Sequence, residues 1–382
     1  MMNRSSHILA LVLSLTLNGC AGNPFMHFVN TVFGIDTGGQ PPLATGAFVR
    51  EVAPGVPSEL GNFPTNGVRF SPDGERFAYV QSSPNSESGR LYVGRADRAA
   101  TATEIVAFPF LEWSPDGKQL AFAVAKQPDD RGRVRFTLKV LEVDTGAVTE
   151  LVEEVVTTWP WLAWSPEGGR ILYASRRNPD VPQEEDLNLY WRNVEQGEPS
   201  FIGVMPPANG KLAQWLPEGD RVLYRAKAPG FATALNLSLF DLEKKTSQIL
   251  RRVPRNAQLV LDSEGKHVAY LEGEDTGNVE GRFAVFRIRL ADGSTEETPF
   301  ELGKVTESGS YSAAGFISPD HRRCLVWHGS SPLFARDLST GEHQQLTSGS
   351  ATPWAWVDGG KAIIVTTRYG STRHFYRVQV ER

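Results

Sequence analysis

The stretch Trp113-Ser114-Pro115-Asp116-Gly117, followed by Gln119-Leu120-Ala121-Phe122-Ala123, decides the fold, because the chain repeats it. Proline ends a strand without needing the N–H that a ladder requires, and Asp-Gly makes a tight reversal in which glycine adopts a positive φ at no steric cost. The residues after the turn read as a returning β-strand. Copies of the motif, less complete toward the C-terminus, begin at Phe70, Trp113, Trp164, Trp215, Leu261, Ile317 and Trp356.

The copies start 39 to 56 residues apart, which is the length of one four-stranded propeller blade. A third strand follows each reversal, and a fourth follows in six of the copies. The aromatic residue ahead of the turn is expected to pack between neighbouring blades, because one blade cannot bury both of its faces alone. We therefore predict an all-β chain, a seven-bladed β-propeller of four-stranded antiparallel blades over residues 46–382.

The last copy has only three strands, and one strand-like segment, residues 47–52, stands ahead of the first copy. We expect residues 47–52 to pair beside residues 374–380, to complete the last blade and to close the ring. Closure removes the open sheet edges that would otherwise pair with other chains.

The repeated turn and its strand resemble the TolB-type, WD40-like (PD40) propeller repeat over residues 46–382. The resemblance implies the fold more strongly than the function, since this repeat occurs in periplasmic scaffold proteins, in peptidase propellers and in some polysaccharide lyases. TolB carries an additional N-terminal α/β domain and the peptidases a C-terminal hydrolase domain. We expect neither here.

The first residues read as an export signal: Arg4 precedes a short apolar core over residues 8–15, too short to span a bilayer. Leu17-Asn18-Gly19-Cys20 resembles the bacterial lipobox, which implies a palmitate-bearing lipoprotein anchored through Cys20. The alternative is an ordinary signal peptide with a chance cysteine. We expect a signal peptide over 1–19 and a lipidated N-terminus and linker over 20–45. In the enterobacterial lipoproteins that this segment resembles, Asp after the cysteine is associated with inner-membrane retention. Ala21 stands there instead, so the resemblance implies the outer membrane, facing the periplasm or the surface.

Charge and cysteine content narrow the partners. The formal net charge is −5, and removing residues 1–19 takes away Arg4 and no acidic residue. The mature chain is then more negative still, which excludes an electrostatic footprint for nucleic acid. With Cys20 lipidated, Cys324 has no partner for a disulfide, and its apolar neighbours predict a small buried side chain.

The sequence contains no Gly-x-Ser-x-Gly elbow, no His-Glu-x-x-His and no phosphate-binding glycine loop, so we assign no catalytic residue. Some lyases with this repeat bind a metal through clustered histidines and a glutamine. His328 and His374 are expected near one another at one rim, but two histidines do not make such a site. We therefore expect no metal and no cofactor.

The rim opposite the repeated turns carries the longest and most charged loops. The candidate binding residues there are Trp159, Trp161, Arg176, Arg177, Tyr311, Trp354 and Arg368. Aromatic rings beside mixed charge suit a polar partner or a sugar-like ligand. Alternatively, the charges are simply solvated, and Trp161 and Trp354 pack between blades.

These observations favour a non-enzymatic binding or scaffold module at the outer membrane, working with an envelope protein partner. The alternative is a propeller enzyme, a lyase or hydrolase that acts on a glycan-like substrate in the central pocket. A third possibility is a sensor or accessory subunit of an envelope complex.

Overall fold

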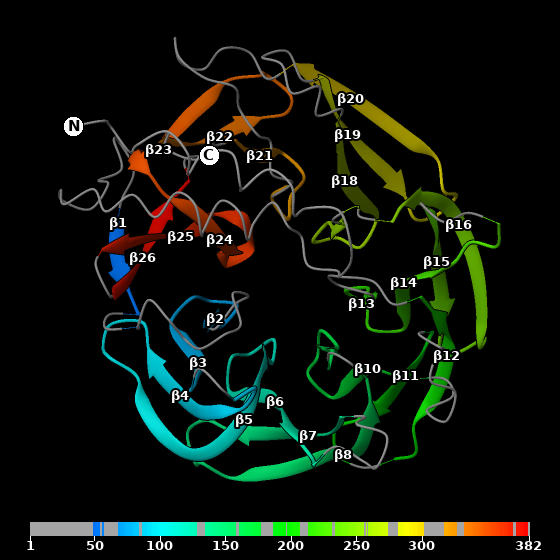
Figure 1. Ribbon diagram of the computed structural model, residues 1–382. Coiled ribbons are helices and arrows are strands. Elements are labelled where there is room, and N and C mark those ends of the chain that lie inside the picture. The colour runs from blue at the N-terminus through cyan, green and yellow to red at the C-terminus, as the bar shows by residue number, and fades with distance from the viewer. Residues whose placement is uncertain are drawn as a thin grey trace, which may run out of the picture.

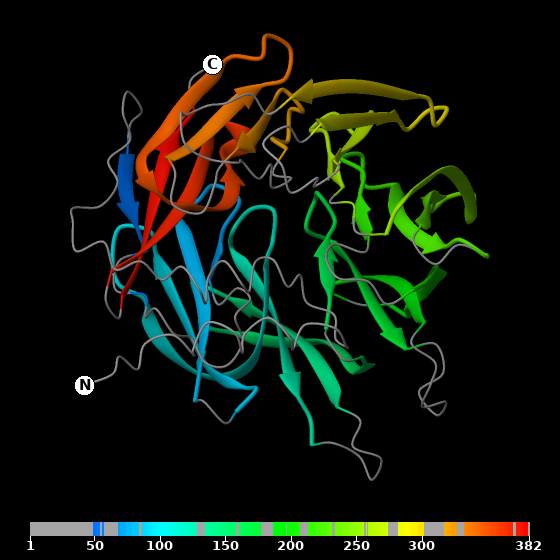
Figure 2. The ribbon, with the colours of Figure 1, turned by 45° about the horizontal axis from the view of Figure 1, so that its top comes forward.

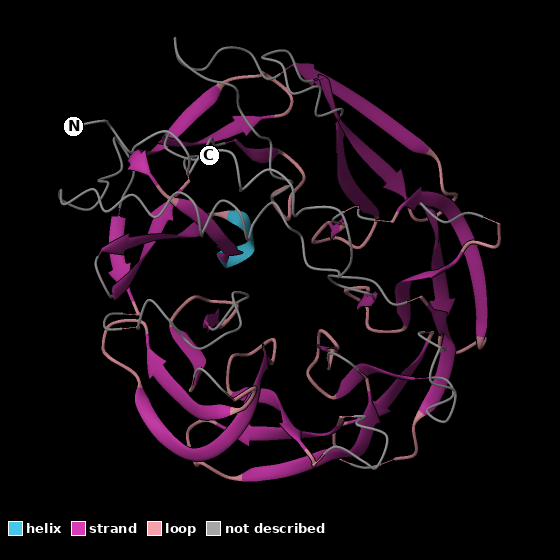
Figure 3. Ribbon diagram, in the orientation of Figure 1, coloured by secondary structure: helices cyan, strands magenta, loops and turns pink. Residues whose placement is uncertain are grey.

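The computed structural model of the protein is all-β, as predicted. It describes residues 49–53, 56, 68–83, 86–127, 134–157, 160–176, 186–195, 197–206, 213–230, 234–255, 257, 259–273, 282–301, 317–326, 332–369 and 372–380. Within these ranges the only helix is a single 3-10 turn, η1 (Asp358–Gly360), drawn in cyan in Figure 3. No helix in the described part of the chain is long and apolar enough to cross a membrane.

Antiparallel sheets surround a central axis, with short strands toward the middle and long ones outside (Figure 1). In the tilted view of Figure 2 the sheets stand side by side around that axis. Three consecutive four-stranded sheets are β9 (Leu162–Trp164), β10 (Arg170–Arg176), β11 (Leu187–Asn193) and β12 (Ser200–Met205); β13 (Ala213–Trp215), β14 (Arg221–Lys227), β15 (Ala234–Asp241) and β16 (Thr246–Pro254); and β17 (Val260–Leu261), β18 (His267–Gly273), β19 (Arg282–Arg289) and β20 (Thr295–Glu301).

One sheet has seven strands because β5 belongs to two repeats. The sheet contains β2 (Val68–Phe70), β3 (Arg76–Ser82), β4 (Gly89–Arg95), β5 (Thr101–Trp113), β6 (Gln119–Ala125), β7 (Arg135–Glu142) and β8 (Val148–Val156). The first half of β5 pairs with β4, and its second half pairs with β6, across a register shift between Phe108 and Leu111. The outer strand of one repeat therefore continues into the inner strand of the next without a loop.

The N-terminal strand pairs as expected. β1 (Val49–Val52) lies antiparallel to β26 (Thr372–Gln379), with Val49 opposite Val378, in the sheet that also holds β25 (Ala362–Tyr369) and β24 (Thr352–Val357). The preceding sheet has three strands, β21 (Arg323–Val326), β22 (Pro332–Asp337) and β23 (His343–Ser350). Where its innermost strand is expected, Ile317 forms a single bridge to Cys324.

Where the motif serine is present, it builds the reversal together with the proline and glycine. Ser114 Oγ donates to Asp116 Oδ1 at 2.7 Å and accepts the backbone N–H of Gln119 at 2.9 Å, while Gly117 has a φ of 67°. Ser71 and Ser318 make the same pair of contacts. The buried hydroxyl thus links the strand before the turn to the strand after it, which satisfies a backbone donor away from water.

The motif tryptophans join adjacent sheets. The indole Nε1 of Trp113 donates to the carbonyl of Arg69, that of Trp164 to Glu112, and that of Trp215 to Ala163, at 3.0, 3.2 and 3.3 Å. Each acceptor is the residue just ahead of the motif aromatic in the preceding repeat. Buried apolar clusters fill the spaces between successive sheets, and Cys324 is buried in one of them, as predicted.

Candidate functional site

The two ends of the sheets differ in character. Each motif turn connects the first strand to the second, so the connection from the second strand to the third lies at the opposite end. We call the end with the motif turns the turn rim. The other end, with the second-to-third-strand connections and the passages between sheets, is the loop rim. In β10, for example, Arg170 lies at the turn rim and Arg176 at the loop rim.

The predicted aromatic residues at the loop rim pack between sheets where they are described. Trp161 lies against the buried cluster that contains Leu172 and Trp215. The indole Nε1 of Trp354 donates to the carbonyl of Val68 at 3.1 Å, and its ring lies 5.5 Å from that of Phe375. Trp159 and Tyr311 lie outside the described residues, so the prediction of an aromatic binding rim stays a prediction.

Of the predicted basic residues, Arg176 is the one whose side chain the structure places at the loop rim. It ends β10 opposite Leu187, is half-buried, and makes no ion pair with another described residue. The backbone of Arg368 lies in β25 opposite Arg373. Arg177, Cys20 and His328 lie outside the described residues, while the backbone carbonyl of His374 in β26 accepts a hydrogen bond from Thr366 Oγ1.

Two further basic side chains stand at the same level as Arg176 in the two preceding repeats. Arg90, near the start of β4, and Lys126, directly after β6, are exposed and form no ion pair with a described residue. The N–H of Lys126 donates to the carbonyl of Arg135 at 2.7 Å, which fixes its position at the end of the hairpin. The sequence signal for Arg90 and Lys126 is their recurrence at hairpin ends, which is visible only once the strand ends are known.

Two other basic residues at this rim are neutralised. The Arg135 guanidinium contacts both oxygens of Glu154, at 2.9 and 2.8 Å, and Lys227 Nζ lies 3.0 Å from Asp186 Oδ2. Arg90, Lys126 and Arg176 form no ion pair with a described residue, and the exposed carboxylate of Glu87 lies in the same connection as Arg90. Exposed basic side chains attract the anionic groups of a ligand locally, although the chain as a whole carries a negative net charge.

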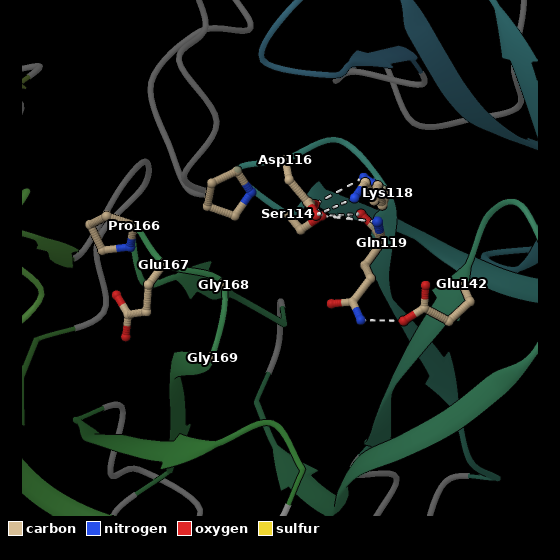
Figure 4. A pocket seen from close by; sticks show the side chains of 10 residues that line it. Ser114, Asp116, Lys118, Gln119, Glu142, Pro166, Glu167, Gly168 and Gly169 are labelled. Atoms are coloured by element: carbon tan, nitrogen blue, oxygen red, sulfur yellow. Dashed lines mark hydrogen bonds and ion pairs between the residues drawn. The ribbon is translucent and has the colours of Figure 1, made fainter.

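The turn rim also contains a cavity, of about 410 Å³, between two successive motif turns. Figure 4 shows Asp116, Lys118 and Glu142 on one side and Glu167 on the other. Burial works to raise the pKa of Asp116, but hydrogen bonds from Ser114 and the N–H of Lys118 outweigh it and hold that pKa below its usual range. These side chains serve the turns themselves, and Glu142 is bonded to Gln119, so the cavity is structural.

The described residues contain no group of three or more His, Cys, Asp or Glu side chains arranged to hold a metal ion.

No protein family and no curated protein matches the sequence, whereas known structures resemble the fold. An oligogalacturonate lyase solved in complex with manganese has a TM-score of 0.55 at 14% identity, covering 82% of this chain and 88% of that one. The oligogalacturonate lyase of Vibrio parahaemolyticus has a TM-score of 0.56 at 12% identity, covering 90% and 99%. A β-propeller domain, from the trilobed protease of Pyrococcus furiosus, has a TM-score of 0.49 at 13% identity, covering 83% and 95%. The chain has a β-propeller fold.

These comparisons correct the expectation of a non-enzymatic scaffold, which is wrong. The two similar structures with TM-scores above 0.5 are enzymes, so a propeller without a familiar catalytic motif is no evidence for a scaffold. The physical reason is that a propeller collects its functional side chains from separate loops around the axis. Such a site leaves no contiguous motif in the sequence.

Proposed function

We propose that this protein is a propeller enzyme that cleaves an acidic oligosaccharide, as a lyase or a hydrolase, at the loop rim around the central axis. One observation carries the proposal: Arg90, Lys126 and Arg176, in three consecutive repeats, present basic groups that form no ion pair with a described residue, at the same end of the sheets. The oligogalacturonate lyases with a similar fold support the choice of a carboxylate-bearing sugar.

The repetition of these groups suits a chain of uronate residues. A carboxylate recurs along such a chain with every sugar, and three consecutive repeats each bring a basic side chain to the rim. Arginine binds a carboxylate through two parallel hydrogen bonds, and lysine binds it as a point charge. Neutralising the carboxylate of the reacting sugar also stabilises negative charge that develops beside it during proton removal, which is the step a lyase must promote.

We propose further that the sheets amount to seven four-stranded blades of the TolB-type repeat. The seven-stranded sheet counts as two blades that share β5, and the bridge at Ile317 marks the missing inner strand of the three-stranded sheet. Seven buried apolar clusters between sheets support this count.

We also propose that the enzyme is exported and held at the outer membrane by a lipid on Cys20. An enzyme at that membrane would encounter oligosaccharides before or during their import. This location favours as partner an envelope protein that delivers or receives the oligosaccharides. Membrane fractions of cells producing the wild type and Cys20→Ala test the anchor: the variant is expected in the soluble fraction. A variant that stays with the membrane would exclude anchoring through Cys20.

The test of the function is incubation of the purified chain with oligogalacturonate and with an uncharged oligosaccharide of equal length. A lyase releases a product with a new carbon–carbon double bond, seen by its ultraviolet absorbance, and a hydrolase releases only a new reducing end. Cleavage of the acidic substrate alone is expected. Absence of both products from a panel of acidic oligosaccharides, with no binding by calorimetry, would refute the proposal.

A further inference from the structure

Arg225 is a buried charge at a position that other repeats fill with an apolar side chain. It lies in β14 and its exposed fraction is 3%. Aligned on the start of the second strand, the corresponding residues are Val80, Ala123 and Ala174, all of them buried. The fold therefore does not require an arginine at this position.

The guanidinium of Arg225 is bound to the backbone of the connection between β16 and β17. Its Nη1 donates to the carbonyl of Arg255 at 3.3 Å, and its Nη2 donates to the carbonyl of Ala257 at 2.5 Å. The connection starts at the loop rim, because Pro254 at the end of β16 pairs with Ala234, at the end of the sheet where Lys227 pairs with Leu235. One planar fork thus holds two points of the connection, two residues apart along the chain.

No described carboxylate neutralises Arg225. The acid of this part of the rim, Asp186, pairs with Lys227 instead, and the Nε of Arg225 is buried with no hydrogen-bond partner among the described residues. Burial lowers the pKa of Arg225 to about 10, which leaves the group charged at neutral pH. A buried charge without a counter-ion destabilises a fold, so an apolar residue would make a more stable protein. Retention of such a group points to a role in function.

We propose that Arg225 is a positioning residue of the oligosaccharide site: through the carbonyls of Arg255 and Ala257 it fixes this connection, and with it the wall of the site, at the loop rim. This inference rests on the proposed function. The connection follows the repeat after that of Arg176, at the same end of the sheets as Arg90, Lys126 and Arg176.

The test compares Arg225→Met, Arg225→Lys and Arg221→Met. Met imitates the apolar residues of the other repeats, and Lys keeps the charge but has one donor group instead of a fork. Arg221 lies in the same strand at the turn rim, near Glu218 and Asp220, so Arg221→Met is the matched control. Should Arg225→Met fail to fold, Arg225→Lys answers the same question.

The first measurement is hydrogen exchange of peptides covering residues 254–261, which needs no ligand. We expect Arg225→Met to exchange at least tenfold faster there, with other connections and Arg221→Met unchanged. Exchange as slow as in the wild type would overturn the positioning role, whatever the enzyme acts on.

The second measurement is steady-state cleavage of oligogalacturonate. We expect Arg225→Met to raise KM about tenfold with kcat nearly unchanged, Arg225→Lys to lie between it and the wild type, and Arg221→Met to have no effect. An unchanged KM despite faster exchange would overturn the link to the ligand. A wild type that neither binds nor cleaves acidic oligosaccharides would instead refute the proposed function, and the exchange result would still decide whether Arg225 holds the connection.

Discussion

The imidazole Nε2 of His321 lies 2.8 Å from the carbonyl oxygen of Val260, in the place that a motif indole occupies elsewhere in the ring. Val260 stands just ahead of Leu261, as Arg69 and Glu112 stand ahead of their motif aromatics. The following repeat has Ile317 where a tryptophan would donate. His321, at the position of the motif glycine with a φ of 57°, supplies the donor instead.

His321→Ala and His321→Gly separate the hydrogen bond from the backbone strain. Both variants lose the bond to Val260 and the buried ring, which we expect to cost about 2–3 kcal/mol of unfolding free energy. Glycine adopts a positive φ freely, whereas alanine does not, so His321→Gly should be more stable than His321→Ala by about 1 kcal/mol. Urea unfolding measures both. Equal stability of the two variants would mean that the backbone relaxes when the ring is removed.

The same residue predicts a pH dependence of stability. Burial lowers the pKa of His321, while the Val260 carbonyl and Asp262 oppose the shift and Arg287 and His267 add to it. The folded state therefore favours neutral histidine. The stabilisation is present above the ordinary histidine pKa near 6.5 and is lost as the pH falls through that value and below.

Urea unfolding at pH 7.5 and at pH 5.5 checks this, with His321→Gln as the control, since glutamine has a donor but does not titrate in this range. We expect the wild type to lose more stability between the two pH values than His321→Gln does. The acid Asp262, whose pKa is lowered, would contribute only below the usual carboxyl range and does not confuse the comparison. The same pH slope in both proteins would count against the assignment.

The indole hydrogen bonds give a prediction for the joints between sheets. Trp164→Phe keeps an aromatic ring but leaves the Glu112 carbonyl without its donor, so we expect a loss of about 1–2 kcal/mol. Trp191→Phe is the control, because Trp191 is half-buried and its indole forms no hydrogen bond with a described residue. Thermal unfolding compares them. An equal loss in both variants would show that ring size, and not the hydrogen bond, matters at the joint.

Two glycines of the turns differ in their surroundings although both have a positive φ. A Cβ on Gly117 would lie 3.3 Å from the Cβ of Ser71 in the neighbouring turn, whereas a Cβ on Gly146 would meet nothing within 4 Å. Each alanine variant should lose about 1 kcal/mol for its left-handed backbone, and Gly117→Ala should lose more because adjacent motif turns then collide. Chemical denaturation tells them apart, and a larger loss in Gly146→Ala would contradict the account.

The repeated turn was sufficient to predict the ring architecture, because proline, serine and glycine act locally. The pairing of β1 with β26 followed from the count of strands, since the last copy of the repeat has only three. The sharing of β5 was not predictable, since Pro109 inside an apolar run reads as a break between strands, and the sheet absorbs it through a register shift. The replacement of a tryptophan by His321 was not predictable for another reason. His321 lies four residues after Ile317, the position of the motif tryptophan, and its ring reaches the Val260 carbonyl from a left-handed backbone.

The site was less accessible to sequence reasoning than the fold. Arg176 was predicted because it opens a long charged loop, and its role stays a prediction, whereas Arg90 and Lys126 look like ordinary surface residues until the hairpin ends are known. Arg225 lies in a strand where a basic residue reads as solvent-facing, and only its burial against Arg255 and Ala257 reveals it. The error about scaffold function had the same origin, because side chains gathered from separate repeats produce no motif.

The central claim is that the loop rim processes an acidic oligosaccharide, and the triple variant Arg90→Gln, Lys126→Gln, Arg176→Gln tests it most directly. Each removed charge-assisted contact should reduce kcat/KM for oligogalacturonate about tenfold at low salt, and added salt should narrow the difference. Lys118→Gln removes a basic residue from the turn rim, near Asp116, and should behave as the wild type. Loss of cleavage in the triple variant with Lys118→Gln unaffected is the predicted result; equal activity of the triple variant and the wild type would contradict the account.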